Sequence, residues 1–167
     1  TFNKITEESI EYFIRSAVKQ ATLVGKDRSR LADVPVVDVT IPLNMKNDPR
    51  NVPMQRKIEI LQAYNNQILN AHELIRMSSV RYSEKYTHKW FANSEGSFVD
   101  HEHIDMGGGL VPIAMKDGQT QMSSVGYGSS SDFEVIVGKE SELEKACRHA
   151  VELLHAPAIE GGVYTVV

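Results

Sequence analysis

The stretch HKWFANSEGSFV, residues 88–99, decides how the middle of this chain folds. Its outer parts are rich in residues that favour strands, and they flank Asn93–Gly96, where asparagine, serine and glycine favour a tight turn. The stretch therefore predicts a β-hairpin. Alternating residues extend its first strand back over 74–86 and 88–92 and its second strand forward over 97–106.

A second hairpin is predicted further along the chain. The dipeptide Asp117-Gly118 is the strongest two-residue turn signal, and it separates alternating stretches at 110–115 and 119–125. Between the two hairpins, Gly107–Gly109 is expected to form a bulge or a sharp corner, because glycine weakens regular strand pairing. The region 74–137 is thus predicted to be strand-rich, with about four or five consecutive antiparallel strands.

Amphipathic helices are predicted on both sides of this region. Apolar residues recur at helical spacing over about 7–24, 53–70 and 140–155. Thr6 is placed to cap the first helix and Pro53 to begin the second. Helices at the ends and strands between them predict an α+β fold, in which an antiparallel meander sheet is flanked by helices.

The composition is that of an ordinary globular protein. Hydrophobic residues make up 41% and charged residues 24% of the 167 residues, which predicts a single domain over 1–167. The net charge of −4 argues against a nucleic-acid binder, which would usually carry a basic stripe. One cysteine, Cys147, and the lack of a signal pattern or long apolar run favour a cytoplasmic protein with no membrane association. We expect Cys147 to be a buried, unreactive thiol.

Two histidines in the second predicted strand are the best candidate for a metal site. Residues two apart in a strand project from the same face, so His101 and His103 could both reach one ion, with Asp105 beside them. Two histidines and a carboxylate resemble part of a zinc site. The alternative, which the rest of the sequence favours, is a solvated face of an antiparallel sheet.

The small residues of 126–131 are the candidate for substrate binding. Flexible, small side chains let a peptide backbone approach closely, so Gly126, Tyr127, Gly128 and Ser129 could line a substrate loop. The alternative is an ordinary surface loop. No arrangement of Ser-His-Asp, Cys-His or paired carboxylates stands out, so no catalytic residue is predicted in this chain.

Several of these segments, in this order, resemble the TldD/PmbA family, once called modulators of DNA gyrase and now regarded as zinc metalloproteases. The resemblance spans residues 6–167 and is somewhat closer to the TldD branch than to the PmbA (TldE) branch. It rests on Tyr82-Ser83, the Asn93–Gly96 turn, the small residues of 123–131 before Phe133-Glu134, the ending AVELLHAP at 150–157, and the glycine turn and valine strand of 161–167.

The resemblance implies that the catalytic centre lies elsewhere. In the family, the strand matching 164–167 leads into a helix with an H-E-x-x-x-H zinc motif, and this chain ends before such a motif. We therefore expect a non-catalytic fragment of the N-terminal domain of a larger two-domain protein, inactive alone, with zinc bound only in the parent protein. Its expected role is to wall the substrate cavity and to contribute to subunit assembly.

The resemblance also implies partners. Members of the family degrade or trim flexible peptides, so unfolded peptides are the expected substrates. The expected protein partner is a TldE/PmbA-like subunit or a second copy of the chain in a homodimer. The alternative is a stand-alone interaction or metal-binding module with no protease activity.

Overall fold

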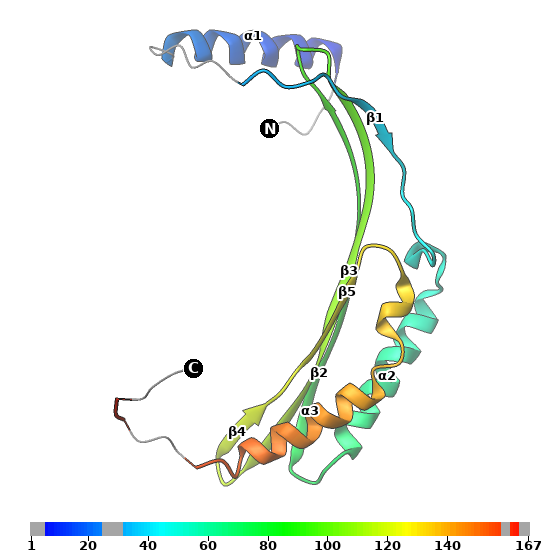
Figure 1. Ribbon diagram of the computed structural model, residues 1–167, viewed down its shortest axis with the longest axis vertical. Coiled ribbons are helices and arrows are strands. Elements are labelled where there is room, and N and C mark those ends of the chain that lie inside the picture. Colours follow the sequence, from blue (N-terminus) through cyan, green and yellow to red (C-terminus); the bar gives the residue numbers. More distant parts are fainter. Residues whose placement is uncertain (1–5, 25–31, 158–160, 164–167) are drawn as a thin grey trace. The chain divides into compact units, whose positions relative to one another are not determined.

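The chain divides into two compact units, Thr1–Val36 and Val37–Val167, in the computed structural model (Figure 1). The structure describes residues 6–24, 32–157 and 161–163. The valine strand expected at 164–167 lies outside these residues. The first unit holds helix α1, Glu7–Val24. The predicted cap is present, because the Thr6 hydroxyl accepts a hydrogen bond from the Ser9 backbone N–H at 3.2 Å.

The second unit is built on a five-stranded sheet with β3 at its centre. Strand β2, Ile75–Ala92, pairs antiparallel with β3, Phe98–Lys116. Three shorter strands pair with β3 on its other side: β1 (Asp38–Ile41), β4 (Gln119–Met122) and β5 (Val125–Ser129). Strands β4 and β5 are antiparallel to β3, whereas β1 is parallel to it. The α+β class and the mainly antiparallel sheet are confirmed, and the parallel β1 is the difference from a simple meander.

Both predicted turns are present, and each has a local cause. In the β2–β3 turn the Asn93 side-chain oxygen accepts a hydrogen bond from the Ser97 N–H at 2.8 Å, and Gly96 has a φ of 99°. In the β3–β4 turn Asp117 and Gly118 have φ values of 49° and 79°. These are left-handed conformations that glycine and aspartate tolerate better than most residues.

The predicted corner at Gly107–Gly109 is wrong, and so is the division of the first strand near residue 87. Both β2 and β3 run through without interruption, and the register between them shifts only between Ile75 and Met77. The glycines have a steric role instead. A Cβ atom on Gly108 would lie 1.9 Å from the carbonyl oxygen of Arg81 and 2.7 Å from the hydroxyl of Tyr127. Only glycine allows this close approach.

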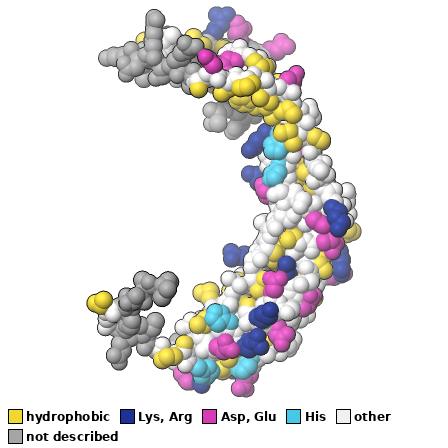
Figure 2. Space-filling model, in the orientation of Figure 1, with side chains coloured by type: hydrophobic (Ala, Val, Ile, Leu, Met, Phe, Trp, Pro, Cys, Tyr) yellow, Lys and Arg dark blue, Asp and Glu magenta, His cyan; other side chains and the backbone are white. Residues whose placement is uncertain are grey.

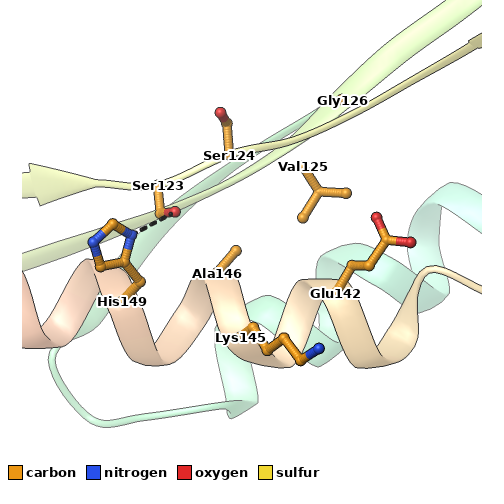
Figure 3. Close-up of a pocket in the computed structure, with 8 residues that line it drawn as sticks. All are labelled: Ser123, Ser124, Val125, Gly126, Glu142, Lys145, Ala146 and His149. Carbon is orange, nitrogen blue, oxygen red and sulfur yellow. Dashed lines mark hydrogen bonds between the residues drawn. The ribbon is translucent and has the colours of Figure 1, made fainter.

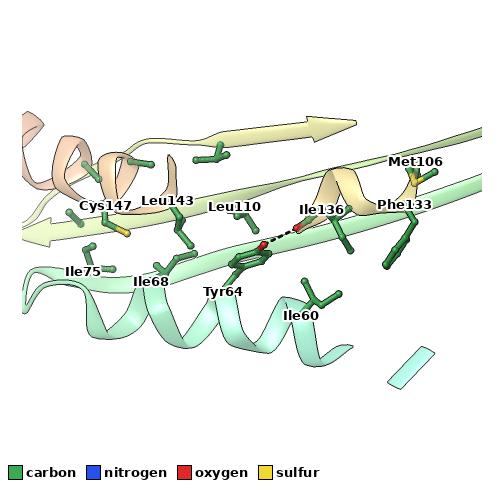
Figure 4. Close-up of a cluster of buried hydrophobic side chains, with 14 of the residues drawn as sticks. Ile60, Tyr64, Ile68, Ile75, Met106, Leu110, Phe133, Ile136, Leu143 and Cys147 are labelled. Atoms are coloured by element: carbon green, nitrogen blue, oxygen red, sulfur yellow. Dashed lines mark hydrogen bonds between the residues drawn. The ribbon is translucent and has the colours of Figure 1, made fainter. Parts of the chain in front are cut away.

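Helices α2, Met54–Asn70, and α3, Glu140–Leu153, cover one face of the sheet (Figure 1). The sequence places these helices at about 53–70 and 140–155. Their apolar sides and the 3-10 helix η2, Phe133–Ile136, enclose the core (Figure 4). Tyr64 links helix α2 to η2, because its hydroxyl donates a hydrogen bond to the Ile136 carbonyl oxygen at 2.8 Å. The fully buried large side chains of the core are Ile68, Ile104, Leu110, Ile136 and Leu143.

Cys147 lies within this core, as predicted, and burial raises the pKa of its thiol. No helix among the described residues is long and apolar enough to cross a membrane.

One buried charge joins α2 to β2. Lys57 is only 4% exposed, and its Nζ lies 2.8 and 2.7 Å from the two carboxylate oxygens of Glu84. The Tyr82 hydroxyl donates to the same carboxylate at 2.6 Å. Burial and this carboxylate raise the pKa of Tyr82 well above its usual range. The hydrogen bonds among these three groups compensate for the loss of water around the Lys57 ammonium group, so this group can be buried.

The other face of the sheet is left open. Successive residues of a strand point to opposite faces. Even-numbered residues of β3, such as Ile104 and Leu110, point toward the helices. The odd-numbered residues of β3, and those of β2 from Met77 onward, therefore point the other way, onto a face that no described helix of this unit covers. We call this the open face.

Candidate functional site

The four residues predicted to line a substrate loop lie in strand β5 or at its end. The loop prediction is therefore wrong, although the residues remain candidates for binding. Gly126 pairs with Gly109 of β3, and Gly128 pairs with Gly107. A stretch that resembles a loop by composition therefore pairs as a strand, and its glycines leave that face of the sheet without side chains.

These two glycine pairs lie together on the open face and expose bare backbone. We call Gly107, Gly109, Gly126 and Gly128 the glycine patch. A Cβ atom on Gly126 would meet nothing within 4 Å, and one on Gly109 would meet only the Val125 carbonyl oxygen, at 3.6 Å. At Gly107 and Gly128 the nearest atoms belong to the backbone of the paired strand. The patch is thus a smooth surface on which another peptide chain could lie.

The other two predicted residues, Tyr127 and Ser129, hold β5 in place. The Tyr127 hydroxyl donates to the Arg81 carbonyl oxygen at 2.5 Å, and burial raises its pKa to about 12. The Ser129 hydroxyl oxygen accepts hydrogen bonds from the N–H groups of Ser131 and Asp132, at 3.0 and 3.1 Å. Of the four residues, the two glycines are those left free to meet a ligand on the open face.

A shallow groove of 470 Å³ lies beside β5, between this strand and helix α3 (Figure 3). Within the described residues β5 pairs with β3 alone, so its other edge is unpaired. The α3 side of the groove carries Glu142 and Lys145, and its far end carries His149. A strand edge next to a groove of this kind can accept an extended peptide as an additional strand. The complete lining is Ser123, Ser124, Val125, Gly126, Glu142, Lys145, Ala146 and His149.

The sequence gives His149 no role beyond its place near a helix C-terminus. Helical spacing does place Glu142, Lys145 and His149 on one side of α3, but the strand they face cannot be inferred from that spacing. The Ser123 hydroxyl lies 3.4 Å from His149 Nδ1. Among the described residues no carboxylate is hydrogen-bonded to this histidine, so the pair lacks the third member of a serine-hydrolase triad.

His101 and His103 lie on the open face, on the same side of β3, and their ring centroids are 5.7 Å apart. His103 is engaged by Asp105, whose carboxylate oxygen lies 2.7 Å from Nε2. Within the part of the chain that the structure describes, no group of three or more His, Cys, Asp or Glu side chains is arranged to hold a metal ion.

Comparison with known proteins adds the last observations. Residues 47–156 match the family described as PmbA/TldA metallopeptidase central domain. Over 169 aligned residues the chain is 28% identical to a protein named Metalloprotease slr0863 from Synechocystis sp. (strain ATCC 27184 / PCC 6803 / Kazusa). That alignment covers 96% of this chain and 35% of the relative, so the chain spans about a third of the relative's length.

Proposed function

This chain belongs to the TldD/PmbA family of metallopeptidases, and we propose that it is a non-catalytic part of a zinc-dependent member that trims flexible peptides. In this proposal the chain forms one side of the substrate cavity and holds the peptide in an extended conformation. The matching family model is described as a central domain, whereas the resemblance implies the N-terminal domain. The cysteine-poor composition favours a cytoplasmic location for the parent protein.

The described residues do not fit the catalytic metal that the family implies. A catalytic zinc takes three protein ligands and an open position, and no described group of three suitable side chains exists. We therefore assign no step of peptide hydrolysis to this chain. Its proposed contribution is to bind and orient the substrate for a zinc centre elsewhere in the parent.

The glycine patch is the observation that carries this proposal. Four glycines on one face leave backbone where other strands would present side chains, so a substrate can lie close to the sheet whatever its own side chains are. The unpaired edge of β5, beside the α3 groove, offers main-chain hydrogen bonds to a separate part of the extended peptide, which would add to the sheet as a strand. Recognition of main chain is tolerant of sequence but requires an unfolded segment.

A substitution at the patch tests the proposal. Gly126→Ile places a branched side chain on the glycine patch, where a Cβ atom meets nothing within 4 Å, so the fold should tolerate it. Gln121→Ile is the matched control, because Gln121 is exposed in β4 and pairs with Ala114, on the face opposite the patch. We expect the first variant to bind an unstructured, fluorescently labelled peptide at least about tenfold more weakly, a change of about 1.4 kcal/mol, and the control to be unchanged.

Two results would contradict the proposal. One is peptide binding by Gly126→Ile that equals binding by the unsubstituted chain. The other concerns the full-length parent protein and compares its cleavage rates for a folded protein and for the same protein unfolded by reduction or truncation. Equal rates would show that the substrate cavity does not select unfolded chains.

Subunit assembly is the second part of the proposal. The end of the β2–β3 hairpin carries two exposed aromatic side chains on the face opposite the open face, with Trp90 63% and Phe98 43% exposed. Exposed aromatic residues are enriched where proteins meet. We assign this end to contact with a TldE/PmbA-like subunit or a second copy of the chain. Sedimentation that shows only monomer, alone and with a purified TldE/PmbA-like subunit, would contradict this assignment.

A further inference from the structure

A group of basic side chains lies on the open face beside the glycine patch. Lys85 and Lys89 come from β2, and His101 and His103 come from β3. The register places Lys89 opposite His101 and Lys85 opposite Asp105, and all of these odd-numbered residues share the open face. Figure 2 shows lysine or arginine and histidine side chains gathered on this side of the hairpin. We call Lys85, Lys89, His101 and His103 the basic cluster.

The positive charge of this cluster is incompletely neutralised by its neighbours. Asp105 is the carboxylate on the same face; it binds His103 at 2.7 Å and accepts a hydrogen bond from the Ser130 hydroxyl at 3.4 Å. The bond to His103 lowers the pKa of Asp105. Among the described residues neither Lys85 nor Lys89 forms an ion pair. Even-numbered positions hold the other nearby carboxylates, Asp100 and Glu102, on the opposite face.

The surroundings of the cluster define an order along the open face. Toward the hairpin turn lies the exposed side chain of Phe91, which pairs with Val99. The exposed Ile41 of β1 lies beside the cluster itself, because it pairs with His101. In the other direction along β3 lies Gly107, the first residue of the glycine patch. An extended chain that follows β3 would therefore meet apolar residues, then basic residues, then bare backbone.

We propose that the basic cluster binds an acidic segment of an extended peptide, next to a bulky apolar residue of the same peptide that contacts Phe91. The proposal rests on the proposed function, because the remainder of such a peptide would lie over the glycine patch. It adds a preference for substrate sequence to a surface that otherwise recognises main chain. An acidic peptide is complementary to Lys85 and Lys89, which in an acidic chain of net charge −4 are a local excess of positive charge.

Nucleic acid is the other polyanion that such a cluster could attract, and the surroundings disfavour it. A nucleic acid carries a phosphate charge at every nucleotide, so its charge extends beyond the two lysines of the cluster, and the net charge of −4 repels the remainder; a peptide with a short acidic segment does not meet this repulsion along its whole length. The adjoining glycine patch has no aromatic ring on which bases could stack. A peptide can use bare backbone, whereas a nucleic-acid base gains little from it.

The test compares three fluorescently labelled probes binding to the 167-residue chain. The first is an unstructured peptide with several glutamates beside a phenylalanine, the second has glutamines in place of the glutamates, and the third is a single-stranded oligonucleotide. The variant is Lys85→Gln with Lys89→Gln. The matched control is Lys19→Gln with Lys116→Gln, which removes the same charge from exposed lysines outside the basic cluster. Circular dichroism confirms that each variant is folded.

We expect the unsubstituted chain to bind the glutamate peptide more tightly than the glutamine peptide, by about two- to fivefold for each lysine. This preference should disappear in the Lys85/Lys89 variant and in about 1 M salt, where charges are screened within about 3 Å. It should persist in the control variant.

Three results would overturn the inference, and they are distinguishable. Equal binding of the two peptides would remove the charge preference and leave peptide holding intact. Tighter binding of the oligonucleotide, lost in the Lys85/Lys89 variant, would show that the cluster binds phosphate. No binding of either peptide would contradict the proposed function itself, and the inference with it.

Discussion

Gly108→Ala should destabilise the protein more than any other single methyl group added to this sheet. The new Cβ atom would lie 1.9 Å from the Arg81 carbonyl oxygen, 2.8 Å from its carbon and 2.7 Å from the Tyr127 hydroxyl. To reach ordinary contact, β2 and β3 would have to separate here by about 1.5 Å, and Tyr127 would have to swing away from Gly108.

The cost has two parts. Overpacking in a well-packed region costs about 1–3 kcal/mol. Loss of the hydrogen bond from Tyr127 to Arg81 costs about 1 kcal/mol more. The sum of about 3 kcal/mol is a large fraction of the 5–15 kcal/mol of a typical domain, and it should lower the melting temperature by about 10 °C. Urea unfolding followed by circular dichroism measures the change directly.

Gly126→Ala is the control for this experiment. Its added methyl group meets nothing within 4 Å, so its free energy of unfolding should stay within about 0.5 kcal/mol of the unsubstituted value. Adding Tyr127→Phe to Gly108→Ala should recover little, because the clash with the Arg81 backbone remains. Equal stability of the Gly108→Ala and Gly126→Ala variants would refute the close approach of β2, β3 and Tyr127 on which the reasoning depends.

Three further predictions concern buried groups. Lys57→Ala removes the ammonium partner of Glu84, which keeps the Tyr82 hydroxyl, and should cost about 2–3 kcal/mol in urea unfolding; the double variant Lys57→Met/Glu84→Leu should recover most of that loss. Stability should be unaffected by Tyr127 below pH ~10 and should fall as the pH rises toward about 12, because the unfolded tyrosine releases its proton first. Tyr127→Phe should show a shallower alkaline loss than the unsubstituted chain. Cys147 should react with a thiol reagent only at the rate of unfolding, and rapid labelling of the native chain would contradict its burial.

Local signals predict a large part of this fold. The Asn93–Gly96 and Asp117-Gly118 turns are specified by residues that adopt unusual backbone angles, so a few neighbouring residues are enough to predict the hairpins. The helices follow from apolar periodicity in the same way. The prolines around residues 34–42 favour a short extended or edge segment, and β1 lies there. Its parallel pairing with residues about sixty positions later, where Phe98 stands opposite Asp38, has no local signal. Periodicity within a segment does not identify its partner.

The glycines show why the residues of the candidate site can be predicted from the sequence, whereas their arrangement cannot. Local propensity correctly marks Gly126 and Gly128 as places where backbone is accessible, but it predicts a loop for them and a corner for Gly107–Gly109. Their partners in space are one another and Tyr127, and these contacts exist only once the strands have paired. His149 is missed for the same reason, because the groove that gives it neighbours forms between two elements.

The arrangement around β3 makes the sheet depend on one strand. Within the described residues each of the other four strands pairs with β3 and with no other strand. Unfolding of β3 would therefore remove every strand pairing described in this sheet, whereas unfolding of β1 would remove four residue pairs. Amide protection against hydrogen exchange should be greatest in β3 and decrease outward on both sides, and β1 should open first. Limited proteolysis should accordingly release β1 from a core that stays folded.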